Sequence, residues 1–238
     1  MLADHEKHVH VALGMALFDT WNFAAEQREY QRAIELNPNL SEAHVGYGSY
    51  LLAIGAINDA IRELTLAHEL DPLSAAPIAI LGATHYFQRN YDKSLEQLRK
   101  AMEIIPTAPI THRDLFYVYE GKGVYDKAVA ERQQEFQLRG RTQQAGAIGE
   151  SYKHGGFEAA LRTMIQIGRH SSSEDYDPFM VAICYSLLED KNQAFVWLSK
   201  AVEAHSGEVT DLKVAPEFDN IRSDPRFEEL VRRIGLPQ

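Results

Sequence analysis

Three histidines near the start of the chain, His5, His8 and His10, come nearest to a spacing that could do chemistry. In the zinc-binding helix motif HExxH the two histidines lie four residues apart, because this spacing places both rings on one face. His8 follows His5 by only three residues in the segment HEKHVH. We therefore expect adventitious metal binding at most, no dedicated metal site and no cofactor.

Other patterns associated with catalysis are incomplete. The fragments GYGSYL (46–51) and GKGVYD (121–126) lack the Lys-Ser/Thr ending of a phosphate-binding loop and the spacing of a dinucleotide turn. There is no G-x-S-x-G elbow, and the single cysteine, Cys184, lies in the apolar run PFMVAICYSLL. We expect Cys184 to be a buried core thiol, and the sequence favours a protein that is not an enzyme.

Composition and charge narrow the class of protein. The 238 residues are 45% hydrophobic and 24% charged, which is typical of a folded protein. The formal charge of −10 opposes binding to nucleic-acid phosphates, which is driven by Lys and Arg. No window approaches the roughly 18 apolar residues of a membrane span. We expect no nucleic-acid or membrane partner, and a cytoplasmic location, or a periplasmic one if a parent protein is membrane-anchored.

An internal repeat organises the front of the chain. The phrases AIELNPN, AHELDPL and AMEIIPT place equivalent residues 34 positions apart: Ala33, Ala67 and Ala101, and Pro38, Pro72 and Pro106. Each unit contains two apolar stretches with the helical period of 3.6, and the prolines end the second stretch. Small residues such as Gly48 and Ala60 are expected to let the two helices of a unit approach closely. The pattern predicts an all-α protein.

This pattern resembles the tetratricopeptide repeat, whose helix–turn–helix units stack into a right-handed superhelix. The resemblance implies a single solenoid domain over 1–238, with about six units and a C-terminal capping helix. We expect units near 7–40, 41–74, 75–108, 109–140, 141–174 and 175–208, and a cap over 209–238. Three residues depart from the pattern, namely Glu26 at the usual alanine position of unit one, and Arg132 and Glu135 in unit four.

Two stretches interrupt the regularity. LRGRTQQAGAIG (138–149) is rich in small and polar residues, and GRHSSSEDYDP (168–178) reads as a loop before a helix that begins near Pro178. Both are interpreted as long surface loops, with a hinge as the alternative.

The charged ending SDPRFEELVRRIGLP has the pattern of a terminal helix. Ser223 or Asp224 can cap its first turn, Pro225 can begin it, and Gly235 can end it. Its apolar residues recur at helical spacing: Phe227, Leu230, Val231 and Ile234. We interpret this segment as the lid of the stack, because the last unit of a solenoid needs a cover with a polar outer face.

The first helices of stacked units should line a concave groove. The repeat register predicts these groove residues: Met15, Val45, Ser49, Ala79, Ala83, Tyr86, Arg113, Tyr117, Glu120 and Tyr152. The Lys, Asn and Arg set with which related proteins clamp acidic chaperone tails is missing, since the first three units carry apolar residues there. The groove suits a peptide with hydrophobic anchors, another domain of a parent protein, or an internal segment of the same molecule.

The last third of the chain, from YDPFMVAICYSLLEDKNQAF to RFEELVRRIGLP, resembles the tetratricopeptide regions of bacterial winged-helix regulators, adenylate cyclases and Ser/Thr kinases. The resemblance implies a sensory or partner-binding part of a signalling or transcriptional regulator. No kinase or cyclase motif occurs in the chain. Two other functions stay open: a structural spacer or homo-oligomerisation module, and a sensor of a small molecule or metal.

Overall fold

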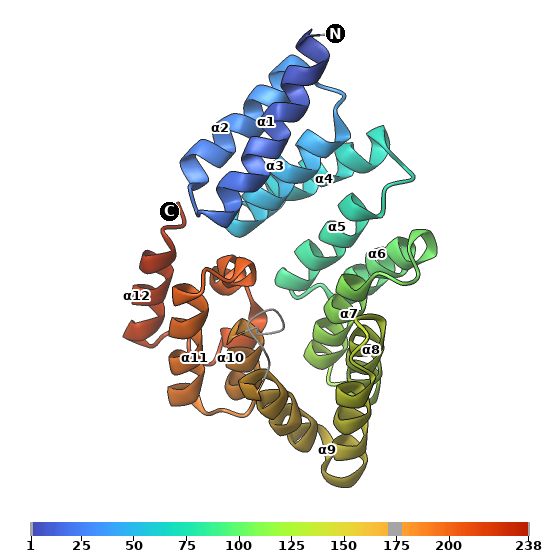
Figure 1. Ribbon diagram of the computed structural model, residues 1–238, viewed down its shortest axis with the longest axis vertical. Helices are drawn as coiled ribbons and strands as arrows, with labels where there is room; N and C mark the ends of the chain where they lie inside the picture. The colour runs from blue at the N-terminus through green and yellow to red at the C-terminus, as the bar shows by residue number, and fades with distance from the viewer. Residues whose placement is uncertain (1, 171–177, 238) are drawn as a thin grey trace.

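The computed structural model describes residues 2–170 and 178–237, and these residues form helices without any β-strand (Figure 1). The expected all-α solenoid is confirmed. The α-helices and 3₁₀ helices run in chain order as α1 (Leu2–Asp19), α2 (Phe23–Leu36), α3 (Ser41–Ala53), α4 (Ile57–Leu70), α5 (Ala75–Phe87), α6 (Tyr91–Ile104), α7 (Pro109–Gly121), α8 (Tyr125–Leu138), α9 (Thr142–His170), α10 (Pro178–Leu187), α11 (Lys191–Glu203), η1 (Gly207–Lys213), η2 (Pro216–Phe218) and α12 (Pro225–Ile234).

The 34-residue spacing has a direct packing cause. A Cβ atom placed on Gly48 would lie 2.7 Å from Cγ of Leu64, and one on Gly82 would lie 2.6 Å from Cγ of Leu98. Since real side-chain contacts are longer, only glycine lets the first helix of these units rest on the leucine of the second. The expected close approach of the paired helices is therefore confirmed.

The turn between the two helices of a unit also repeats. Its last-but-one residue takes left-handed backbone angles, with φ of 83° at Gly55 and 71° at Gly123. Trp21 and Arg89 occupy the same position in units one and three with φ of 55° and 60°. Because side chains disfavour this conformation, two large residues there need compensating contacts.

The fifth unit corrects the sequence interpretation. Only residues 139–141 separate α8 from α9, so the expected long loop or hinge over 138–149 is wrong. The small residues of this stretch are helical, because a glycine can serve close packing as well as a turn: Gly149 lies directly against the Gln133 side chain. The chain reverses later, at Gly155 and Gly156, where Gly156 has φ of 67° and α9 breaks into two helical halves.

The second irregular stretch, 168–178, lies partly outside the described residues, which omit 171–177. Its first three residues still belong to α9, and Pro178 begins α10 as expected. α10 and α11 then form the last helix pair of the array.

The terminal helix has the predicted caps and the predicted buried face. The side chain of Asp224 accepts a hydrogen bond from the backbone N–H of Arg226, and Gly235 ends α12 with φ of 76°. Phe227, Leu230 and Ile234 are buried, and Val231, the fourth residue of the predicted face, is partly buried against the same core. α12 packs against α11, so it covers the end of the last pair.

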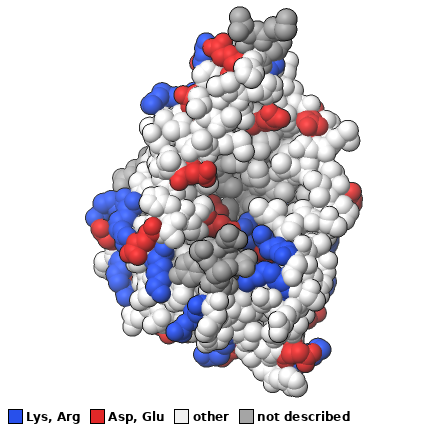
Figure 2. Space-filling model, viewed as in Figure 1, with Lys and Arg blue, Asp and Glu red and all other residues white. Residues whose placement is uncertain are grey.

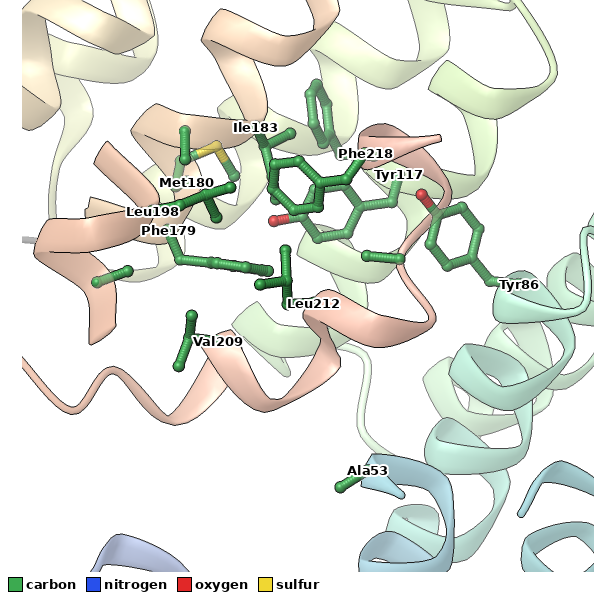
Figure 3. Packing of buried hydrophobic residues seen from close by; sticks show 14 of the residues in the cluster. Ala53, Tyr86, Tyr117, Phe179, Met180, Ile183, Leu198, Val209, Leu212 and Phe218 are labelled. Atoms are coloured by element: carbon green, nitrogen blue, oxygen red, sulfur yellow. The ribbon is translucent and has the colours of Figure 1, made fainter. Parts of the chain in front are cut away.

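The array curls so far that its two ends approach each other (Figure 1). After α11 the chain returns toward the N-terminal helices, and η1 packs against α3. Residues 205–221, called the strap below, include η1 and η2. Figure 3 shows Val209, Leu212 and Phe218 of the strap directed toward Phe179 and Met180 of α10. The strap is therefore anchored in the hydrophobic core.

Candidate binding groove

A groove of about 1760 Å³ runs along the concave side of the array, and the strap forms its opposite wall. Figure 2 shows a hollow near the middle of the molecule. Eight of the ten residues predicted from the repeat register line this groove: Met15, Val45, Ser49, Ala79, Ala83, Tyr86, Arg113 and Tyr117.

Two predicted residues lie elsewhere. Glu120 lines a second recess of about 340 Å³, together with Tyr91 and Glu217. Tyr152 is half-buried in α9 and packs against the core, outside both the groove and the recess. The turn before α9 (139–141) is one residue shorter than the turns before α3, α5 and α7, so the register of the earlier units is shifted at α9.

The strap follows the row of turns that joins the first and second helices of units one to three. His205 stacks on Trp21 with ring centroids 4.3 Å apart. Lys213 Nζ donates to the carbonyl oxygen of Ile54 at 3.3 Å. Arg89 Nη2 donates to both carboxylate oxygens of Asp219, at 2.5 and 2.6 Å. Trp21 and Arg89, the two non-glycine residues with left-handed backbone angles in these turns, thus both contact the strap.

Inner contacts fix the strap from the other side. Arg113 of α7 donates to Glu208 of η1, and also to Asp114 at 3.2 Å. The Ser186 hydroxyl of α10 donates to the carbonyl oxygen of Glu217 at 2.7 Å. Part of the concave surface is therefore already covered by the chain itself, which is one of the occupants that the sequence left open.

Carboxyl groups gather where the strap meets the array. Burial raises the pKa of Asp211 and of Glu217 to about 7. Burial, followed by the nearby charge of Glu217, raises the pKa of Glu120 to about 8. These groups keep their protons to a much higher pH than exposed carboxyl groups do, because ionisation in this buried setting is costly.

The departures from the repeat pattern mark two features that the groove prediction missed. Arg132 is buried between the rings of Phe116 and Phe136, and it donates to the buried carboxylate of Glu135. Glu26 is buried in α2 and also lines the groove. The sequence signal was present in both cases: a charged residue stood where the other units have a small or apolar one.

The described residues contain no group of three His, Cys, Asp or Glu side chains placed to hold a metal ion. Two of the three N-terminal histidines have separate partners, since Nδ1 of His8 lies 3.3 Å from Oε2 of Glu42 and Nδ1 of His10 lies 2.5 Å from Oε2 of Glu29. Cys184 is buried beside the sulfur of Met180. In the described part of the chain, every helix is too short or too polar to cross a bilayer.

Comparisons with the sequences of curated proteins match part of the chain. No family model matches the chain. The Hsp70-Hsp90 organizing protein 1 of Glycine max is 26% identical over 93 residues, which are 39% of this chain and 16% of that protein. The Hsp70-Hsp90 organizing protein 3 of Arabidopsis thaliana is 25% identical over 93 residues, which are 39% of this chain and 17% of that protein. The chain thus spans about a sixth of the length of these curated relatives.

Solved structures are similar over nearly the whole chain. The pilF protein of Pseudomonas aeruginosa has a TM-score of 0.61 at 16% identity, covering 90% of this chain and 98% of that one. A chain of the Cut9–Hcn1 complex has a TM-score of 0.61 at 17% identity, and the match covers 96% of this chain and 43% of that one. A thermophilic TPR protein of Thermus thermophilus has a TM-score of 0.56 at 17% identity, and the match covers 95% of this chain and 99% of that one. The 34-residue repeat, the stacked helix pairs and these similarities together show that this chain has the fold of a tetratricopeptide-repeat protein.

Proposed function

We propose that this chain is a non-catalytic scaffold that binds a protein or peptide in the N-terminal half of its concave groove. In a larger parent it would be the interaction part of a bacterial signalling or transcriptional regulator. One observation carries the proposal: the first helices of three successive units, α1, α3 and α5, line a continuous groove, and the strap does not fill it. Met15 in this groove is 62% exposed.

The character of the lining supports a peptide ligand. Apolar side chains that are still at least partly exposed, Met15 and Val45, line the same groove as small ones such as Ala79 and Ala83. Small residues leave room for the side chains of a ligand, and the apolar ones gain from being covered. The names of the similar proteins point the same way, since two are Hsp70-Hsp90 organizing proteins and one is part of a complex with Hcn1.

The other half of the groove is a poorer site for a partner. There, Arg113 and Glu208 join the array to the strap, and Tyr117 is 9% exposed. A ligand would have to displace a segment that buries Leu212 and Phe218 completely. Substituting Arg113 or Tyr117 is therefore expected to loosen the strap before it changes partner binding.

A peptide-display selection on the immobilised protein tests the proposal, with Ala83→Arg as the groove variant. Ala83 is half-buried in the groove, so a guanidinium side chain there should lower peptide affinity at least tenfold. The matched control is Ala147→Arg, on the exposed face of α9. Circular dichroism and thermal melting should be unchanged in both. Equal binding of the selected peptides to all three proteins would overturn the groove as the binding site.

A second function, oligomerisation, is favoured by a separate observation. Val9 and Leu13 lie one turn apart on α1 and are 41% and 44% exposed. An exposed apolar strip at the open end of an array can pair with a second copy. If so, light scattering should show an oligomer that Leu13→Glu converts to a monomer. A wild-type protein that stays monomeric at high concentration would exclude this function.

A further inference from the structure

The charges that line the groove are divided between its two halves. Between α1 and α5 the groove lining of the described chain contains one histidine, His8, and four carboxylic acids: Asp19, Glu26, Glu42 and Asp71. Lys and Arg are absent from this part of the described lining. A ligand in the N-terminal half therefore meets negative charge.

The cations that line the groove lie in the other half and already have partners. Arg113 pairs with Asp114 and Glu208, while Arg132 and Arg139 both pair with Glu135. Arg141 lies over the ring of Phe136, 4.6 Å from its centre. Figure 2 shows a group of Lys and Arg atoms on the lower right of the hollow. These arginines therefore have partners within the chain, whereas the acids of the N-terminal half have no Lys or Arg beside them in the described lining.

Glu26 is the acid of this half that most needs a counter-ion. Glu26 is only 2% exposed, and its Oε2 atom has no hydrogen-bond partner among the described residues. The equivalent positions in later units hold Ala60, Ser94 and Ala128, which carry no charge. A buried carboxyl group without a partner is costly, and burial accordingly raises the pKa of Glu26 to about 7.

We propose that the N-terminal half of the groove binds a peptide segment with one Lys or Arg between apolar residues, whose cationic group pairs with Glu26. This inference rests on the proposed function and names the chemistry of its partner. The apolar flanks would cover Met15 and Val45 of the same groove. An acidic segment would be repelled here, and a purely apolar one would leave Glu26 without a partner.

Burial makes this single contact selective. Opposite charges attract each other much more strongly out of water than on the surface, and Glu26 is already buried before a ligand arrives. The pair also supplies the hydrogen bond that Oε2 lacks. The net charge of −10 further favours encounter with basic segments. We expect loss of the Glu26 charge to weaken binding of a basic peptide by one to two orders of magnitude.

The experiment uses a random peptide-display library as the probe, selected in parallel on three full-length proteins. These are the wild type, Glu26→Gln and the control Glu35→Gln, which removes an exposed acid from the same helix outside the groove. Wild type and control should enrich peptides with a central Lys or Arg, and Glu26→Gln should not. A selected peptide should bind Glu26→Gln at least tenfold more weakly than wild type.

A second readout needs no variant and so remains valid if Glu26→Gln folds poorly. The pKa of the Glu26 carboxyl group, followed by carbon NMR in the wild type, should fall when a selected basic peptide is added. A pKa that does not move, or peptides without a basic residue that still bind the groove, would overturn this inference alone. Failure to enrich any peptide that Ala83→Arg excludes would instead overturn the proposed function.

Discussion

The Nδ1 atom of His44 lies 2.6 Å from Oε2 of Glu63, and His112 and Glu131 of the fourth unit are also 2.6 Å apart. The other ring nitrogen of His44 lies 2.9 Å from the carbonyl oxygen of Pro38. One imidazole therefore links both helices of its unit to the turn that precedes them. These histidines have a structural role that their sequence positions alone did not reveal.

The His44–Glu63 pair should contribute measurably to stability. His44 is buried, so His44→Ala leaves Glu63 without its partner and should cost about 1–3 kcal/mol of the free energy of unfolding. Urea unfolding of His44→Ala, Glu63→Ala and the double variant measures the coupling between them, expected at about 0.5 kcal/mol or more. The control is His154→Ala, whose side chain is 83% exposed. Strict additivity of the two single effects would contradict the prediction.

Gly82→Ala should destabilise the protein, although alanine is the better helix former. The new Cβ atom would lie 2.6 Å from Cγ of Leu98, which is completely buried and cannot move without repacking. We expect a loss of about 1–3 kcal/mol, as for other overpacked cores. Thermal and urea unfolding check it.

The control for that substitution is Gly146→Ala in α9, where an added Cβ atom meets nothing within 4 Å. There the helix propensity of alanine should dominate and raise stability by about 0.5–1 kcal/mol. If Gly82→Ala lowers the free energy of unfolding and Gly146→Ala raises it, packing determines why the repeat keeps a small residue at the Gly82 position. A change in the same direction in both variants would contradict this explanation.

The repeat made the helices predictable because its cause is local. Gly82 and Leu98 are 16 residues apart within one unit, so a single packing contact leaves a signal in every copy of the pattern. The error at 138–149 arose because glycine and small polar residues serve both turns and close helix contacts. Gly149 against Gln133 is a case of the second use.

The strap could not be predicted in the same way. Arg89 and Asp219 are 130 residues apart, and nothing in the repeat states how far the array curls. The superhelix brings the two ends together through small rotations summed over the units. The repeat register alone placed eight of the predicted residues in the groove. That the strap lines and divides this groove could be seen only in the structure.

Stability should fall as the pH rises from about 5 to 8. The pKa values of Glu120, Asp211 and Glu217 are raised to about 8, 7 and 7, so the folded chain binds more protons than the unfolded chain in this range. Stability then decreases with pH, because folding opposes the release of these protons. Urea midpoints at pH 5.5 and 8.0 measure the difference, expected to exceed about 1 kcal/mol.

A variant assigns this pH dependence to the strap. Glu217→Gln keeps the shape of the side chain and removes its charge, so the difference between the two pH values should shrink. The control Glu158→Gln, with a side chain that is 76% exposed, should leave the difference unchanged. An equal pH dependence in Glu217→Gln and wild type would show that the buried carboxyl group of Glu217 does not control it.

Arg113→Met should release the strap while the helix pairs stay folded. Arg113 is the cation that pairs with Glu208 and Asp114, so its loss leaves these two acids and nearby Asp211 without a counter-charge. Amide hydrogen exchange should then show protection factors in η1 at least tenfold lower, with α3 and α4 little changed. The loss of protection in η1 should be greater at pH 8 than at pH 6, because Asp211 is largely protonated at pH 6.

The control for this variant is Arg162→Met, which replaces a side chain that is 68% exposed. Unchanged protection in η1, or an equal loss throughout the array, would show that Arg113 does not hold the strap.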